Sequence, residues 1–425
     1  MIFNSTKEKI FFFKIPVILF SLIPFFLITG PFLSDFSIST ISILFLIYCL
    51  KKKNFSYFKN IYFYFFLLFW IYLLVNSLIN NFNFDSIKIS FFYFRYGIFV
   101  IAIIALLNVE DKFIKYFYYC IFFCFTGLIL DSFYQYFIGE NILGFKTPNP
   151  ARVSSFFHEE MILGGYLARL WPIFFGLSII IFKQKNKFFY FFVLLFILSE
   201  TIIFLSGDRV AFFYINLSAF FVIILSQKLF KLRLFILSAS IILIVIISII
   251  NPTAKDRVFD TTLRDMNLLD SQKQKREQEG VYIFTKEHTH HYITAYRIFL
   301  DNKILGVGVK NFRFFCKDKK YQESFLSCST HPHNTYIQIL SETGIIGFLF
   351  LIIIFFIYII NVFKHLILRL KGKYHFNDFE ICILSGIAIY LWPIVPTGNI
   401  FNNWLNIIMI LNLPLLIWGR KVIKT

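Results

Sequence analysis

The chain has 425 residues, of which 58% are hydrophobic, 21% aromatic and 16% charged, and its mean hydropathy is +0.71. A soluble domain is nearer half apolar and about a quarter charged, so this composition excludes a soluble globular protein. The net charge of +18 does not indicate nucleic-acid binding, because Lys and Arg stand in short clusters between apolar segments, as membrane topology requires.

A helix that spans a membrane needs about 20 mostly apolar residues. Segments of this kind follow one another along most of the chain, and no small-residue cleavage site follows the first, so we expect it to remain as a helix. The fold class expected is an all-α polytopic membrane protein with about twelve transmembrane helices and one large periplasmic loop. The expected spans lie near residues 10–29, 36–50, 61–79, 91–107, 116–137, 161–182, 188–205, 210–227, 234–250, 339–363, 379–396 and 400–419.

The basic residues predict the orientation. Most Lys and Arg outside the long loop fall at alternate span ends, together with the N-terminus, whereas the short outer loops hold only Lys88, Lys146, Arg152 and Arg209. This imbalance predicts a multi-pass protein of the bacterial inner membrane with both termini in the cytoplasm. The chain then divides into residues 1–250 with helices 1–9, a periplasmic loop at 251–338, and residues 339–425 with helices 10–12.

Two cysteines, Cys316 and Cys328, lie in the large outer loop. An oxidising periplasm would join them in a disulfide, and the alternative is two free thiols. The other four cysteines fall in membrane segments, where cysteine behaves as a small apolar residue. We therefore predict one disulfide, within the outer loop.

Charged side chains at the outer ends of the helices are the first candidates for function. Arg152 can offer a planar fork of donors to a phosphate, or can touch lipid headgroups instead. Arg209 ends a hairpin, Ser206–Arg209, that has almost no loop and could equally hold a structural ion pair with the neighbouring aspartate. Arg297 precedes a glycine-containing turn, and its alternative is a solvated helix face.

A histidine segment stands where the outer loop re-enters the membrane, with His331, His333 and Asn334 in succession. Histidine can accept a proton near neutral pH, which makes His333 a candidate base. The competing interpretation is that it only orients a substrate or caps the following helix.

Metal binding is the weaker interpretation of a second histidine group. Glu287, His288, His290 and His291 could ligate a metal, but the sequence supplies no matching closed set of ligands. No Asp-x-Asp pair occurs in an outer loop, which argues against a divalent cation that holds a diphosphate. We therefore predict no metal and no cofactor.

With these residues in view, the chain resembles the O-antigen ligase and polymerase superfamily over roughly residues 120–365. Arg152 and the Ser206–Arg209 hairpin fit by position, and His158–Glu160 departs from the Pro-Asn turn of many members. The most specific matches are Arg297, the turn from Asp301 to Gly308, His333, Asn334, Gln338, Glu342, Gly344 and Gly347.

The resemblance implies a helical membrane fold that moves a glycan from a polyprenyl diphosphate carrier to an acceptor hydroxyl without a metal. By position, it assigns the substrate-binding roles to Arg152, Arg209, Arg297 and Asn334, and the catalytic role to His333. The partners implied are the polyprenyl diphosphate-linked glycan donor, lipid A-core or another glycan acceptor, and membrane lipid.

The acceptor is not visible in the sequence. The favoured interpretation is an O-antigen ligase that acts on lipid A-core, and a repeat-unit polymerase or a protein O-glycosyltransferase would use the same chemistry. From a different class, a lipid-linked glycan flippase or transporter could also have twelve helices. It would not need a long outer loop that ends in a histidine motif, and the halves of the chain show no repeat of the kind on which many transporters are built.

Overall fold

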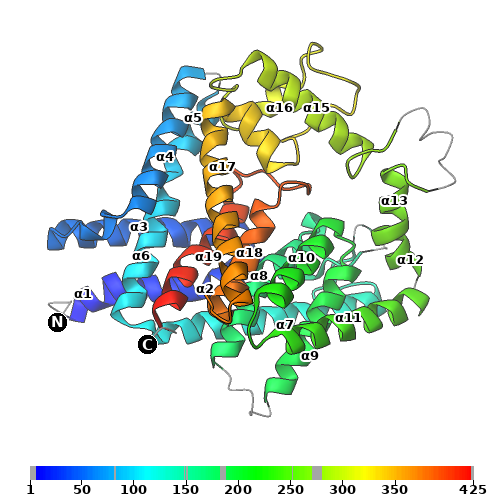
Figure 1. Ribbon diagram of the computed structural model, residues 1–425, viewed down its shortest axis with the longest axis horizontal. Coiled ribbons are helices and arrows are strands. Elements are labelled where there is room, and N and C mark those ends of the chain that lie inside the picture. Colours follow the sequence, from blue (N-terminus) through cyan, green and yellow to red (C-terminus); the bar gives the residue numbers. More distant parts are fainter. Residues whose placement is uncertain are drawn as a thin grey trace.

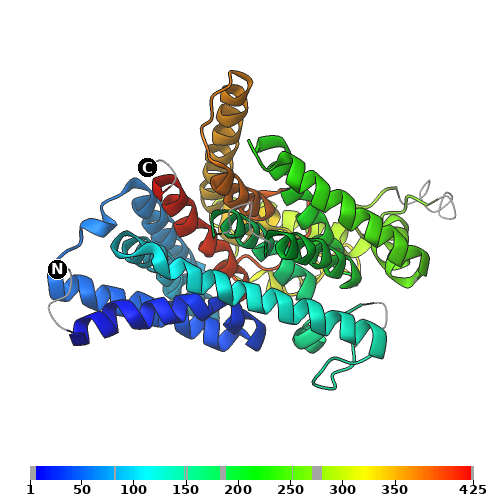
Figure 2. The same cartoon turned by 90° about the horizontal axis from the view of Figure 1, so that it is seen from below.

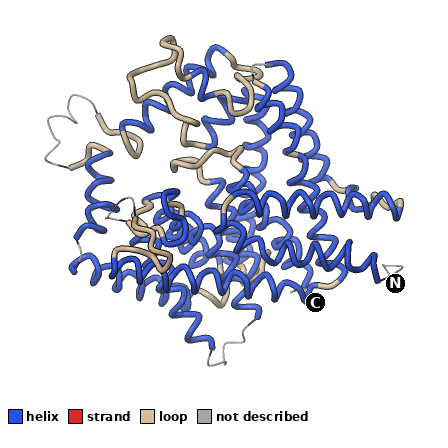
Figure 3. Tube along the Cα trace, turned by 180° about the vertical axis from the view of Figure 1, so that it is seen from behind, coloured by secondary structure: helices blue, strands red, loops and turns tan. Residues whose placement is uncertain are grey.

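The computed structural model describes residues 6–80, 83–147, 149, 152–181, 188–250, 252–269 and 280–422. The protein is 77% helical, and the described residues contain no strand (Figure 3). Eight helical segments are long and apolar enough to cross a membrane by length and composition. The predicted all-α polytopic membrane fold is confirmed.

A helix overlaps each of the twelve expected apolar segments. These helices are α2 (Ile15–Thr29), α3 (Pro31–Lys52), α4 (Ile61–Asn80), α6 (Phe94–Val109, preceded by α5, Phe84–Phe92), α7 (Ile114–Ile138), α8 (Leu163–Ile181), α9 (Phe188–Leu205), α10 (Arg209–Leu225), α11 (Phe230–Ile250), α17 (Thr335–Leu370), α18 (Asp378–Leu391) and α19 (Asn403–Val422). The long outer segment between α11 and α17 contains α12 (Pro252–Lys255), the π-helical turn η5 (Asp256–Asp260), α13 (Thr261–Asp265), α15 (Lys286–Asp301) and α16 (Phe312–Phe315).

The centre of the molecule is α8, whose residues from Leu163 to Ser178 are all buried. It packs against α9, α10 and α18, while α2 packs between α3 and α7 (Figure 2). In the apolar windows of the peripheral helices α4, α11 and α17, only 17%, 22% and 22% of the residues are buried. Apolar side chains cover these exposed faces, which is the arrangement expected where lipid is the solvent.

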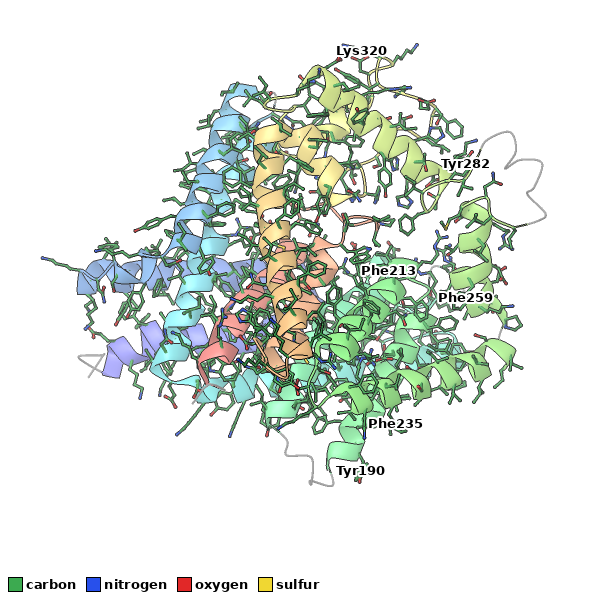
Figure 4. The ribbon with its side chains drawn as sticks, viewed as in Figure 1. Tyr190, Phe213, Phe235, Phe259, Tyr282 and Lys320 are labelled. Carbon is green, nitrogen blue, oxygen red and sulfur yellow. A yellow bond between two sulfur atoms is a disulfide. The ribbon has the colours of Figure 1, made fainter. Side chains whose placement is uncertain are left out.

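In Figure 1 the two ends of the chain lie at the lower left, whereas α15 and α16 lie along the top and α12 and α13 along the right edge. Figure 4 shows the same division, with Tyr282 and Lys320 of the outer segment far from Tyr190 at the start of α9. The polar segment between α11 and α17 therefore covers one end of the helical bundle.

The turn that follows α15 is clamped onto the beginning of α17. Val307 N donates to Ser341 O at 3.1 Å and Ile345 N donates to Lys303 O at 2.9 Å. The close approach requires glycine, because a Cβ on Gly344 would lie 2.2 Å from the carbonyl oxygen of Ile304, and Gly344 itself has a φ of 62°. We call residues 303–312 and 338–345 the clasp.

A buried carboxylate completes the clasp. Glu342 accepts hydrogen bonds from the backbone N–H groups of Lys310 and Phe312 at 3.0 and 3.2 Å, and from Nε2 of Gln338 at 3.0 Å. Gln338 also donates to Oδ1 of Asn399 at 3.0 Å. The carboxylate oxygens of Glu342 thus hold the turn against α17 and do not face solvent.

An irregular loop at 392–402 supports the histidine segment from below. The helix α18 ends at Leu391, five residues before the predicted end, because the residue before Pro393 is extended. The loop meets the histidine segment through Thr397 N, which donates to the carbonyl oxygen of His333 at 2.8 Å, and through Pro393 O, which accepts from Nδ2 of Asn334 at 2.8 Å.

Candidate functional site

The hairpin between α9 and α10 is held by its own polar groups and by Arg152. Asp208 begins α10, and its Oδ1 accepts from the N–H groups of Val210 and Ala211 at 3.1 and 3.0 Å. The Nε of Arg152 donates to the carbonyl oxygen of Ser206 at 2.7 Å. Asp208 is therefore a helix cap, and the structural Asp208–Arg209 pair left open by the sequence does not form.

Two arginines cross this hairpin at Gly207. A Cβ on Gly207 would lie 2.7 Å from Cγ of Arg152 and 3.1 Å from Cγ of Arg257, so only the absence of a side chain lets both pass. Arg209 lies beside them and pairs with Asp265, Nη1 to Oδ2, at 2.7 Å. We call Arg152, Arg209 and Arg257 the arginine cluster.

Positive charge is in excess in the arginine cluster. Burial lowers the pKa of Arg152, and the charges of Arg257 and Arg209 lower it further, against the opposing effect of Asp208. Burial likewise lowers the pKa of Arg257. The Nε of Arg257 is buried without a hydrogen-bond partner among the described residues. A buried donor without an acceptor is costly, and an anion with several oxygens would supply acceptors.

Arg297 is not brought to the arginine cluster. Its Nη1 donates to the carbonyl oxygen of Gln322 at 3.1 Å, and its Nη2 pairs with Glu323. Nine residues separate Arg297 from His288 on α15, which places the two on opposite faces at 3.6 residues per turn. The expected grouping of Arg297 with Arg152 and Arg209 is therefore not observed.

Four histidines meet in one group of rings. The ring centroid of His333 lies 4.0 Å from that of His331, 5.2 Å from that of His288 and 5.4 Å from that of His291. His288 and His291 come from successive turns of α15, whereas His331 and His333 come from the segment before α17. The positive charge of Arg209 is among the smaller causes that lower the pKa of His288.

Hydrogen bonds distinguish the rings. His331 uses both nitrogens, with Nδ1 3.0 Å from Oγ1 of Thr330 and Nε2 3.2 Å from the carbonyl oxygen of Thr397, to which it must donate. Nδ1 of His288 lies 2.8 Å from Oγ1 of Thr285. The ring of His333 has no hydrogen-bond partner among the described residues, so its nitrogens remain available to a ligand.

The histidines are neutral at physiological pH. Burial lowers the pKa of His333 from 6.5 to about 4, and the charge of a protonated His291 would lower it further. Burial is also the main cause that lowers the pKa of His288 to about 4 and that of His331 to about 3. A neutral imidazole has a lone pair that can take a proton, and a bound anion would raise these pKa values and strengthen the bases.

The remaining predicted site residues have structural partners. Asn334 caps α17, and its Oδ1 accepts from the N–H groups of Tyr336 and Ile337 at 3.0 and 3.2 Å. Cys316 and Cys328 are joined by a disulfide with their Cα atoms 5.0 Å apart. No group of three or more His, Cys, Asp or Glu side chains within the described ranges has a geometry that could hold a metal ion.

Sequence reasoning did not single out Arg257, and it considered His288 and His291 only as metal ligands, an interpretation that it set aside. Arg257 stands in a polar stretch that resembled an ordinary surface helix, and the only available signal was its place just beyond the end of a span. The i, i+3 spacing of His288 and His291 puts them on one face of α15, and the fold brings this face to His333.

A comparison with protein families places these side chains in context. Residues 191–352 match the O-antigen ligase family, a range that includes Arg209, Arg257 and His333 and leaves Arg152 outside. A comparison with curated proteins finds no match. The chain is thus similar to the O-antigen ligase family over residues 191–352.

Proposed function

We propose that the protein is a membrane glycosyltransferase that moves a glycan from a polyprenyl diphosphate carrier to an acceptor hydroxyl, with lipid A-core as the acceptor, as in an O-antigen ligase. The observation that carries the proposal is the neutral ring of His333, which has no hydrogen-bond partner among the described residues, and the arginine cluster adds a buried donor that also lacks a partner.

In the proposed reaction, the acceptor oxygen attacks the anomeric carbon of the donor glycan. The bond from this carbon to the diphosphate oxygen breaks, and the leaving group departs as the polyprenyl diphosphate. The proton of the acceptor hydroxyl passes to a ring nitrogen of His333. Each bond that breaks is matched by one that forms, and no redox partner is required.

The arginine cluster stabilises the charge that develops on the leaving diphosphate. Fixed donors that are already oriented and partly withdrawn from water are effective at this task. Arg152, Arg209 and Arg257 are the residues assigned to it, and Arg257 takes the place that the resemblance gave to Arg297. Arg297 instead supports the outer segment through Gln322 and Glu323.

The protein then belongs in the bacterial inner membrane, with both termini in the cytoplasm and the segment between α11 and α17 in the periplasm. The donor's lipid tail would remain in the bilayer while its glycan and diphosphate meet the site at the outer ends of the helices. Access of a periplasmic reporter fused at Gln274, which is outside the described residues, tests this orientation.

Surface polysaccharide from cells with and without the gene tests the function. Loss of the gene should leave lipid A-core without attached polymer, and the purified protein should form the linked product from lipid-linked donor and lipid A-core. Core capped by a single repeat unit would identify a polymerase, and unchanged polysaccharide would contradict the proposal.

A further inference from the structure

A buried arginine, Arg169, stands on α8 in the centre of the bundle and is 8% exposed. Its Nη1 donates to the carbonyl oxygen of Gly165 at 3.1 Å, and its Nε is buried without a hydrogen-bond partner among the described residues. Arg95 and Arg233, which also lie in apolar helices, pair with carboxylates at 2.6 and 2.7 Å, whereas Arg169 forms no ion pair with the described residues. A buried charge is costly unless it is paired, and such a residue within a membrane span is a candidate for function.

On one side, Arg169 faces the hairpin that carries the arginine cluster. Gly165 lies one turn before Arg169, and a Cβ on Gly165 would lie 2.8 Å from Nη1 of Arg169 and 3.6 Å from Oδ2 of Asp208. The absence of a side chain at Gly165 therefore lets the guanidinium lie close to the hairpin. Asp208 attracts this charge without forming an ion pair with it, and its Oδ1 caps α10.

On the other side, Arg169 stacks on two tyrosines. Its guanidinium carbon lies 4.8 Å from the ring centroid of Tyr214 on α10 and 6.0 Å from that of Tyr390 on α18. A cation over an aromatic ring is attracted by the ring face, and more strongly where water is excluded. Tyr214 is itself 1% exposed, so the stacking holds its ring in one orientation.

The hydroxyl of Tyr214 reaches the loop at 392–402, which supports the histidine segment. This hydroxyl donates to the carbonyl oxygen of Pro396 at 3.3 Å. The N–H of the next residue, Thr397, donates to the carbonyl oxygen of His333 at 2.8 Å. A continuous series of contacts thus leads from Arg169 through Tyr214 and the loop to the backbone of His333.

We propose that Arg169 and Tyr214 are positioning residues, which fix the ring of His333 where it can take the proton of the acceptor. Arg169 orients Tyr214, and Tyr214 holds the loop at 392–402, so neither residue contacts the substrate. A base must lie within hydrogen-bond reach of the proton it removes, and a misplacement of about 1 Å can cost about 10²-fold in rate. This inference rests on the proposed function, to which it adds two residues of the membrane helices.

The test uses the full-length protein in nanodiscs of phosphatidylcholine. Tyr214→Phe removes one oxygen atom and leaves the ring beside Arg169, and Arg169→Met removes the charge and keeps a long side chain. The matched control is Tyr358→Phe, because Tyr358 is a buried tyrosine of α17 whose hydroxyl donates to the carbonyl oxygen of Leu384, within α18, at 3.2 Å.

Tyr214→Phe should lower kcat by about two- to tenfold, the usual effect of losing one hydrogen bond, and Arg169→Met should lower it at least as much. KM for the lipid-linked donor should stay unchanged, because the arginine cluster is intact, and Tyr358→Phe should behave as wild type. If Arg169→Met does not fold, Tyr214→Phe decides alone. An unchanged kcat, a raised KM for the donor in place of the lowered kcat, or an equal loss in Tyr358→Phe would overturn the inference.

A double variant shows whether the effect passes through His333. In the His333→Ala protein, Tyr214→Phe should cause no further loss of the residual glycan transfer, because a residue that acts only through another has no effect once the other is removed. A further loss of the same size as in the wild-type protein would overturn the inference.

Chemical modification of His333 separates this inference from the proposed function. Diethyl pyrocarbonate modifies neutral imidazole rings, and mass spectrometry follows its reaction at His333 without any glycan. The rate should rise severalfold in Tyr214→Phe and Arg169→Met, because a loosened loop exposes the half-buried ring, and should not change in Tyr358→Phe. Such a rise in a protein whose wild type transfers no glycan would support the positioning role and contradict only the proposed function, whereas unchanged rates in all variants would overturn the inference.

Discussion

The clasp and the arginine cluster are both built on glycines and charged side chains, yet they treat polar groups in opposite ways. In the clasp, the oxygens of Glu342 accept from Lys310 N, Phe312 N and Gln338. In the arginine cluster, Gly207 lets two guanidinium groups cross, and the Nε of Arg257 is left without an acceptor. The paired carboxylate of Glu342 holds the clasp together, whereas the buried donor of Arg257 would gain from an acceptor on a bound ligand.

The same contrast separates neighbours in the histidine segment. The side chain of Asn334 forms hydrogen bonds with the start of α17 and with Pro393. Both ring nitrogens of His331 form hydrogen bonds, with Thr330 and with Thr397. His333 keeps its ring free. The hydrogen bonds therefore distinguish the residues of this segment: Asn334 and His331 have structural partners, and the ring of His333 does not.

The largest expected effect is in the clasp. Gly344→Ala should prevent the turn from closing on α17, because the new Cβ would collide with the carbonyl oxygen of Ile304 at a φ of 62°. Gly344 combines this φ with a ψ of −168°, a region used almost only by glycine, and this conformation alone costs about 1–3 kcal/mol for a residue with a side chain. Thermal unfolding in detergent should show the loss. Gly372→Ala is the matched control, since Gly372 has a φ of 69° but open space around it, and equal destabilisation by the two would mean that the close approach is unimportant.

The next effect is on the chemistry. His333→Gln and His333→Ala should each reduce glycan transfer by about 10²–10⁴, the usual value of general-base assistance, while the protein inserts and unfolds as the wild type does. His331→Ala should be milder, because His331 only positions the segment. Turnover is measured with purified lipid-linked donor, and near-normal turnover by His333→Gln would rule out proton transfer by this ring.

A smaller effect is expected in the pH profile. Because His333 acts as a neutral base and its pKa is lowered to about 4, kcat/KM should persist through pH 5 and be lost as the pH falls through about 4. The acid limb of kcat should lie at higher pH, since a bound diphosphate favours the imidazolium. The loss must reverse on return to pH 7. An acid limb of kcat/KM near 6.5, the value of an unperturbed histidine, would contradict the burial of this ring.

Much of the fold was predictable because the membrane restricts the alternatives. Apolar runs of about 20 residues can only be helices when lipid surrounds them, so each expected span overlaps a helix. The early end of α18 at Leu391 was less visible, although Pro393 gave a local signal. The contact between the loop at 392–402 and the backbone of His333 could not be predicted from the sequence.

The positions of the candidate site residues could be predicted where a short loop fixes them. They could not be predicted where tertiary packing decides which residues come together. Arg152 and Arg209 stand at short loops between spans, so their position at the ends of helices followed from the pattern of apolar segments. Arg297 and Arg257 lie in the long outer segment, where only tertiary structure decides which face of a helix meets the site. Arg297 turned toward Glu323, and Arg257, which nothing in the sequence singled out, crossed Gly207.

The exchange of Arg257 for Arg297 gives the most direct test of the proposed site. Glycan transfer by Arg257→Ala and Arg297→Ala should be compared at saturating acceptor while the lipid-linked donor is varied, with folded protein quantified in each preparation. The account predicts that Arg257→Ala loses most of its kcat/KM for the donor and that Arg297→Ala stays within about threefold of wild type, as expected for an exposed ion pair of low energy. Normal transfer by Arg257→Ala together with inactive Arg297→Ala would contradict it.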